Sequence, residues 1–196
     1  MLKLYILIFF LGYTACTSND EHQLQDEITI HPKLHEDDDY YEIFKKSTRT
    51  RGVYDNFETK YHIQATYLSP EFRSAFDKRL KDLTSTPAFN LGANIQKAGF
   101  FVSIFGPDAK KIDLNNQNLW SIILESNDKK FQPSVVRYLA DKERWSPFFE
   151  HVHKWTKEYF IMFESSTISP PASDMLANQK FLLKLSNLDA AVSMSW

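Results

Sequence analysis

Apolar and polar residues alternate with a period of two along several short stretches of the chain. In the segment 60–68, Tyr61, Ile63 and Tyr67 fall on one face and polar residues fall on the other. This period is typical of a strand that buries one face. Six further segments have apolar patterns that also predict strands. They are 99–105, 119–126, 134–140, 157–165, 180–186 and 190–196.

One segment has the three- and four-residue period of a helix instead. It begins at Ser69-Pro70-Glu71, where Ser is a favoured N-cap and Pro loses no hydrogen bond at the first helical position. The apolar positions that follow are Phe72, Ala75, Phe76, Leu80 and Leu83. We therefore expect an amphipathic helix that closes over a sheet. Its other face, which we expect to be solvated, carries Arg73, Lys78, Arg79 and Lys81.

Seven predicted strands with one or two accessory helices indicate a mainly β protein. We expect an antiparallel β-sandwich over residues 53–196, because parallel strands would need repeated crossover helices. A rival fold is a small outer-membrane β-barrel, since Val192, Met194 and Trp196 alternate in the last segment. The predicted strands are nearer seven residues long, whereas barrel strands need about ten. The sandwich is therefore the preferred prediction.

The first residues have the pattern of a signal peptide. Lys3 supplies a positive charge, the apolar run 4–11 follows it, and small residues precede Cys16. A helix over residues 4–16 would span roughly 20 Å, against about 30 Å for the hydrocarbon core of a membrane. We therefore expect residues 1–15 to be a cleaved leader.

Cys16 is the only cysteine in the chain, so no intramolecular disulfide is possible. The sequence Tyr13-Thr14-Ala15-Cys16 resembles the lipobox of bacterial lipoproteins, although Tyr13 stands where an aliphatic residue is usual. The resemblance implies that Cys16 is lipidated, becomes the mature N-terminus and attaches the protein to a membrane. Thr17, rather than Asp, resembles the pattern sorted to the outer membrane in enterobacteria. We expect a lipid-anchored cell-envelope protein, with the outer membrane or cell surface favoured over the inner membrane; the alternative is that Cys16 is incidental.

The stretch that follows Cys16 is strongly acidic. Residues 17–44 contain nine acidic residues and one basic residue, a formal charge of −8, whereas residues 45–196 carry a formal charge of +5. The acidic run 35–42 lacks the alternating carboxylates and the glycine of a calcium loop. We therefore expect residues 16–52 to form a lipidated N-terminus and an acidic disordered tether. The net charge of −2 gives no reason to expect a nucleic acid partner.

Candidate ligand-binding residues gather between residues 145 and 160. His151 and His153 would share a face in an extended segment and could begin a metal site with Glu150 or another histidine. Two histidines do not make a zinc site, however, and no metal is predicted. The same stretch is rich in aromatic residues, which suit either a recognition platform for carbohydrate or peptide or core packing. The candidate ligand-binding residues are Trp145, Phe148, Trp155, His151 and His153.

Motifs for catalysis do not occur in the sequence. No GxSxG, P-loop or dinucleotide fingerprint is present, so no catalytic residue and no cofactor is predicted. The favoured hypothesis is a non-enzymatic envelope lipoprotein that binds another protein or a surface glycan. The alternative is a membrane-anchored hydrolase of cell-wall or extracellular polymers, which would need an acidic cleft with shifted carboxylate pKa values.

Overall fold

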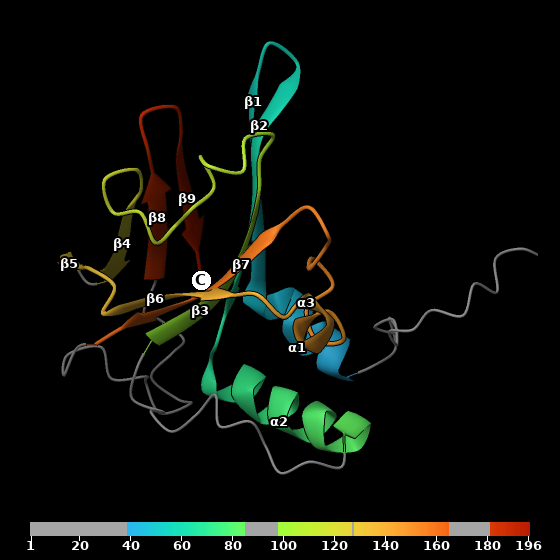
Figure 1. Ribbon diagram of the computed structural model, residues 1–196. Coiled ribbons are helices and arrows are strands. Elements are labelled where there is room, and N and C mark those ends of the chain that lie inside the picture. Colours follow the sequence, from blue (N-terminus) through green and yellow to red (C-terminus); the bar gives the residue numbers. More distant parts are fainter. Residues whose placement is uncertain (1–38, 85–97, 127, 165–180) are drawn as a thin grey trace, which may run out of the picture. The chain divides into compact units, whose positions relative to one another are not determined.

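The computed structural model describes residues 39–84, 98–126, 128–164 and 181–196. All of them belong to one compact unit, His31–Trp196. Cys16 and most of the predicted tether lie outside the described residues. The described part is mainly β, with two antiparallel sheets arranged as a sandwich and a few short helices (Figure 1). The predicted fold class is therefore confirmed.

The two sheets contain five and four strands. The larger has the order β1-β2-β3-β7-β6 and the smaller β5-β4-β8-β9, and neither closes on itself within the described ranges. The strands of the larger sheet are β1 (Thr48–Asp55), β2 (Glu58–Tyr67), β3 (Ala98–Phe105), β6 (Val135–Leu139) and β7 (Lys157–Phe163). Those of the smaller sheet are β4 (Ser121–Ser126), β5 (Lys129–Phe131), β8 (Phe181–Ser186) and β9 (Ala191–Ser195). Each of the seven predicted segments corresponds to one of these strands.

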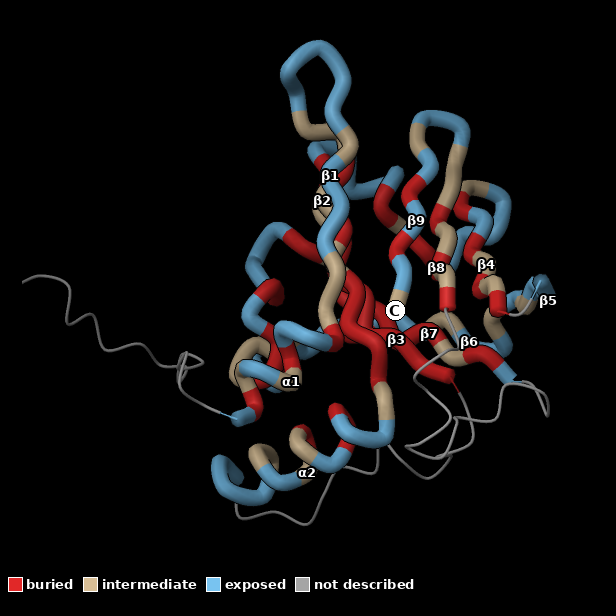
Figure 2. The backbone as a smooth tube through the Cα atoms, turned by 180° about the vertical axis from the view of Figure 1, so that it is seen from behind, coloured by how far each residue is buried: buried red, intermediate tan, exposed pale blue. Residues whose placement is uncertain are grey.

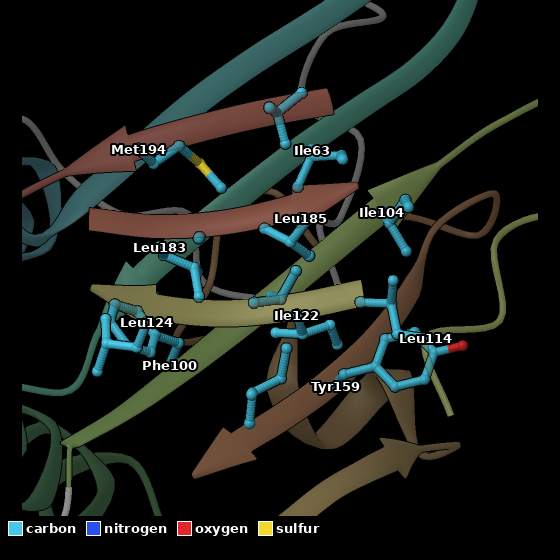
Figure 3. Close-up of a cluster of buried hydrophobic side chains, with 14 of the residues drawn as sticks. Ile63, Phe100, Ile104, Leu114, Ile122, Leu124, Tyr159, Leu183, Leu185 and Met194 are labelled. Atoms are coloured by element: carbon cyan, nitrogen blue, oxygen red, sulfur yellow. The ribbon is translucent and has the colours of Figure 1, made fainter. Parts of the chain in front are cut away.

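The main hydrophobic core lies between the two sheets. Tyr61, Ile63 and Tyr67 of β2 are buried there, as the period of two predicts. Leu183 and Leu185 of β8 face the larger sheet from the opposite layer (Figure 3). Because each buried side chain of this kind contributes about 1.5–3 kcal/mol, the alternation along β2 and β8 accounts for much of the cohesion between the layers.

The other face of the larger sheet is covered by α1 (Asp39–Ser47), α2 (Pro70–Thr84), α3 (Lys142–Trp145) and the chain that follows α3. These segments form a second apolar cluster with residues of β3 and β7. Strand β3 is therefore buried on both faces, which explains why its sequence is a nearly continuous apolar run rather than an alternating one.

Helix α2 begins where the sequence predicts. The Phe72 backbone N–H donates to Ser69 Oγ at 3.0 Å, so Ser69 is the expected N-cap. Phe72 and Phe76 are buried. The prediction for Arg73 was wrong: it is buried, and its Nε donates to the Leu68 carbonyl at 2.7 Å. The long side chain extends back to the turn before the helix, where its polar end satisfies a backbone carbonyl.

None of the described helices is long and apolar enough to cross a membrane.

The folded body begins earlier than residue 53. Residues 39–52, which the composition assigned to a disordered tether, form α1 and most of β1. Tyr40 and Phe44 of α1 are buried, and the Tyr40 hydroxyl donates to the Phe148 carbonyl at 2.8 Å. Acidic residues in the first turn of α1 and basic residues in its last turn complement the helix dipole. Tyr40 and Phe44 are enough to pack this otherwise polar helix onto the second apolar cluster. Two apolar residues are too few to give a recognisable helical pattern in the sequence.

The edges of the two sheets approach each other at β1 and β9. Arg49 Nε donates to the Ser195 carbonyl at 2.9 Å, and the guanidinium lies 5.7 Å from the Trp196 ring. Trp196 Nε1 donates to the Ser47 carbonyl at 2.6 Å. The terminal aromatic residue therefore fastens α1 and β1 to the last strand.

Candidate functional site

Two of the three predicted aromatic ligand residues belong to the core. Trp145 and Phe148 are buried in the second apolar cluster. The Phe148 ring centroid lies 4.6 Å from that of Phe76, and the Trp145 ring meets Phe160 edge-on at 5.2 Å. The packing interpretation therefore holds for both residues. Trp155 is exposed, with Lys154 Nζ lying 4.7 Å from the centre of its ring.

The chain between α3 and β7 is held over the sheet by Lys142. Its Nζ lies 3.7 Å from Glu158 Oε2 and donates to the His153 carbonyl at 2.7 Å and to the Thr156 carbonyl. The Thr156 hydroxyl donates to Glu158 Oε1. Glu158 is fully buried, and burial raises the pKa of its carboxyl, with Thr156 and Lys142 acting in the opposite direction. We call Lys142, Thr156 and Glu158 the lysine clamp.

His151 belongs to this segment of the chain. It is buried, with its ring stacked on Phe44 at 5.6 Å and lying 5.7 Å from the ring of Phe101. Burial lowers the pKa of His151 to about 3, and the nearby His153 and His62 act in the same direction. The imidazole is therefore neutral at physiological pH. Its Nε2 has no hydrogen-bond partner in the described part of the chain.

A row of polar side chains crosses the helix-covered face of the larger sheet. Thr50, Gln64, Ser103 and Glu158 stand opposite one another in register across β1, β2, β3 and β7. The Ser103 hydroxyl donates to the His151 carbonyl at 3.2 Å. One end of this row is covered by the lysine clamp, and the other end opens into a pocket.

We call this opening the histidine pocket. It has a volume of about 390 Å³, and both predicted histidines contribute to its wall. Its lining residues are Phe44, Lys45, Thr48, Thr50, Gln64, Glu150, His151 and His153. In the described ranges, no three His, Cys, Asp or Glu residues gather closely enough to hold a metal ion. His151, His153 and Glu150 therefore line one pocket without forming a metal centre.

A second surface, which the sequence did not indicate, lies at the tips of two hairpins. In the β1–β2 turn, Asn56 and Phe57 both have positive φ angles, 49° and 66°. Phe57 is fully exposed and Tyr54 is 66% exposed. Leu188, between β8 and β9, is also fully exposed. The two hairpins end on the same side of the described body (Figures 1 and 2). We call the exposed residues Tyr54, Phe57 and Leu188, together with a pocket lined by residues of both hairpins, the hairpin end.

The pocket of the hairpin end has a volume of about 340 Å³ and a polar wall. Its lining residues are Val53, Tyr54, Asp55, Lys60, Tyr61, Pro107, Asp108, Lys111 and Asp189. Lys60 Nζ lies 3.4 Å from Asp55, and Lys111 Nζ lies 2.8 Å from Asp189. Hydrogen bonding to Lys111 lowers the pKa of the Asp189 carboxyl, which keeps Asp189 ionised at neutral pH. The charges at this end are thus arranged as pairs around exposed apolar side chains.

Comparison of the chain with protein-family models gave no match, and comparison with curated proteins gave none.

Proposed function

We propose that this protein is a lipid-anchored protein of the cell envelope that binds another protein through the hairpin end. The observation that carries the binding role is Phe57, a fully exposed aromatic side chain in a left-handed backbone conformation. Two-residue hairpin turns favour Asn or Gly at such positions, and a bulky residue there is strained. The Phe57 side chain contributes nothing to the described core, and contact with a partner would give it a role.

The surroundings of Phe57 support an interface with a protein. Large aromatic residues at the centre of a patch with a polar rim are typical of the residues that contribute most to binding. Tyr54 and Leu188 add apolar area, and the Lys60–Asp55 and Lys111–Asp189 pairs supply the polar rim.

The carboxylates of the described residues favour binding over hydrolysis. A hydrolase of glycan polymers needs two carboxyl groups facing each other across the scissile bond, one of them with a raised pKa. Raised carboxyl pKa values occur at Glu158 and Asp77. Glu158 is buried in the lysine clamp, and neither residue lines the histidine pocket or the hairpin end. Of the three acidic residues that line the pocket of the hairpin end, Asp55 and Asp189 are paired with lysines, and Asp108 accepts a hydrogen bond from the Lys110 backbone N–H.

The binding role is tested by placing a photoreactive phenylalanine analogue at Phe57 in the full chain, expressed in its own cells. Tyr138 on β6, which is also exposed, is the matched control position. We expect one discrete crosslinked protein from position 57 and none from position 138. Leu188→Asn should weaken that crosslink severalfold, in line with the loss of one apolar contact of the patch. No crosslink from position 57, or the same products from both positions, would refute the proposal.

The membrane attachment needs a separate measurement, the intact mass of the protein extracted from membranes. We expect a mass that corresponds to cleavage before Cys16 plus acyl groups, and the Cys16→Ser variant should lose those groups. A mass that retains residues 1–15 would exclude the anchor but would leave the crosslinking result unchanged.

A further inference from the structure

The histidine pocket is a separate site, because it shares no lining residue with the hairpin end. Its volume of about 390 Å³ falls in the range of about 300–1,000 Å³ that is usual for small-molecule sites. Thr50 and Gln64 are held by the β1–β2 ladder, and His151 is held by the Ser103 hydrogen bond and by ring stacking. The polar groups of the wall are therefore placed before a ligand arrives.

Four hydrogen-bonding groups of the pocket wall are neutral. Thr50 offers a hydroxyl, Gln64 offers an amide and His151 has a neutral imidazole, while the Thr48 hydroxyl already shares a hydrogen bond with Thr66 Oγ1 at 2.8 Å. Every one of these groups can both donate and accept a hydrogen bond. This is the pattern that matches ligand hydroxyl groups, which also donate and accept.

The charged residues of the pocket do not favour an ionic ligand. Lys45 and Glu150 carry opposite charges and both are exposed, so their fields largely cancel. Lys45 Nζ also lies 5.2 Å from the centre of the Tyr41 ring. A phosphate or carboxylate ligand would need a concentrated positive charge, which the described wall of the pocket does not provide.

His151 supplies an independent indication of a polar ligand. Its side chain is buried, it lines the pocket, and Nε2 has no hydrogen-bond partner among the described residues. Buried polar atoms are nearly always paired in folded proteins, and an unpaired one costs about 1–3 kcal/mol. Nε2 is itself shielded from solvent, so a ligand hydroxyl that completes this hydrogen bond must first displace part of the pocket wall, and doing so would recover that free energy.

We infer that the histidine pocket binds a neutral, polyhydroxylated ligand of the size of a mono- or disaccharide. The pocket brings together neutral donor–acceptor side chains, one acidic and one basic residue, the buried His151 and the aromatic side chain of Phe44. The pocket meets the second apolar cluster at Phe44, but the predicted ligand residues Trp145 and Phe148 of that cluster do not line it. The inference depends on neither the lipid anchor nor the hairpin end.

The test is NMR of the histidine imidazoles in the full chain carrying Cys16→Ser, purified in a detergent without a sugar headgroup. The neutral probes are glucose, galactose, mannose, N-acetylglucosamine and their common disaccharides. Inorganic phosphate and glutamate are the charged probes. We expect at least one neutral saccharide to shift the His151 and His153 signals saturably, and the charged probes to leave them unchanged.

Variants of the pocket wall make the test specific. Gln64→Leu should weaken the saccharide affinity about tenfold, as the loss of one or two hydrogen bonds predicts. Thr50→Val, on the exposed edge strand, serves the same purpose if Gln64→Leu does not fold. Thr59→Val, on β2 outside both pockets, is the matched control and should bind normally. The inference is overturned if no neutral saccharide binds, if only a charged probe binds, or if both wall variants bind as tightly as the unaltered chain.

Discussion

At the scale of single residues, three positions depart from what their local environment favours. Phe57 has a left-handed backbone conformation, His151 is a buried imidazole with an unpaired nitrogen, and Glu158 is a buried carboxyl. Each departure carries a free-energy cost that the surrounding structure must offset. These costs can be measured as changes in the free energy of unfolding on mutation. A substitution that stabilises the fold indicates a binding role for the original residue, and one that destabilises it indicates a structural role.

Phe57→Gly should raise the free energy of unfolding. Glycine adopts positive φ without steric penalty, whereas the left-handed region costs other residues roughly 1–2 kcal/mol. We expect a gain of about 1 kcal/mol in denaturant unfolding, together with loss of partner crosslinking at the hairpin end. Asn56→Gly is the control and should have a smaller effect, because Asn tolerates this conformation. Destabilisation by Phe57→Gly would mean that the side chain supports the fold instead.

His151 should make the fold sensitive to acid. The pKa of His151 is about 3 in the folded state and near 6.5 when unfolded. Above about pH 6.5 both states are neutral, and between pH 6.5 and 3 protonation favours the unfolded chain. The stability contributed by His151 is therefore lost across that window, at up to about 1.4 kcal/mol per pH unit.

The loss of stability between about pH 6.5 and pH 3 is called the acid limb below. The variant His151→Phe removes the titrating group, so its free energy of unfolding should fall less steeply between pH 7 and pH 4. The raised pKa of Glu158 acts in the opposite direction, because the folded state then binds its proton more tightly than the unfolded state. This contribution of Glu158 is the same in the unaltered protein and in His151→Phe. His153→Asn, at an exposed position, should leave the acid limb in place. An unchanged limb in His151→Phe would show that His151 is not its cause.

At the scale of elements, the predictions succeed where one segment contains its own signal. Segment 60–68 alternates, and the helix that begins at Ser69 has a cap and an apolar stripe, so both are recognisable without their partners. The edge strand β1 is mostly exposed and therefore lacks the alternation. The histidine pocket could not be predicted, because Thr50, Gln64 and His151 meet only through strand register and through the path of the chain before β7.

The lysine clamp gives an element-scale prediction for the chain between α3 and β7. Lys142→Met leaves Glu158 as a buried charge without its ion-pair partner and removes the donor to two carbonyls. We expect the free energy of unfolding at pH 7 to fall by about 3 kcal/mol. In a Glu158→Gln background the same change should cost only about 1 kcal/mol, the value of the lost hydrogen bonds.

This double-mutant cycle separates the charge from the packing of the lysine side chain. Lys154→Met, in the same stretch but at an exposed position, should change stability by less than about 0.5 kcal/mol. Equal costs for Lys142→Met in the two backgrounds would show that Lys142 does not compensate the charge of Glu158.

At the scale of the whole molecule, the two sheets and the helices are held together by residues that lie far apart in sequence. Arg49 and Trp196 link the first described strand to the last, and Tyr40 links α1 to the chain after α3. Contacts between residues so far apart in sequence cannot be recognised from a local pattern of residues. The boundary predicted at residue 53, between the tether and the folded body, therefore did not take them into account. Asp39 and Glu42 lie in the first turn of α1 and Lys45 and Lys46 in its last turn, so these charged residues belong to a helix and not to a spacer.

The position of the true boundary yields the last prediction. A chain that begins at residue 53 lacks α1 and most of β1, and so exposes the apolar surface that Tyr40 and Phe44 cover. Each such aromatic side chain contributes about 1.5–3 kcal/mol on burial, and the total stability of a domain is only about 5–15 kcal/mol. The loss of the Arg49 and Trp196 contacts adds to this deficit. We therefore expect a chain that begins at His31 to unfold cooperatively, and one that begins at Val53 to show no cooperative transition in thermal and denaturant melts. Matching transitions for the two chains would place α1 and β1 outside the stable unit and restore the boundary that composition predicts.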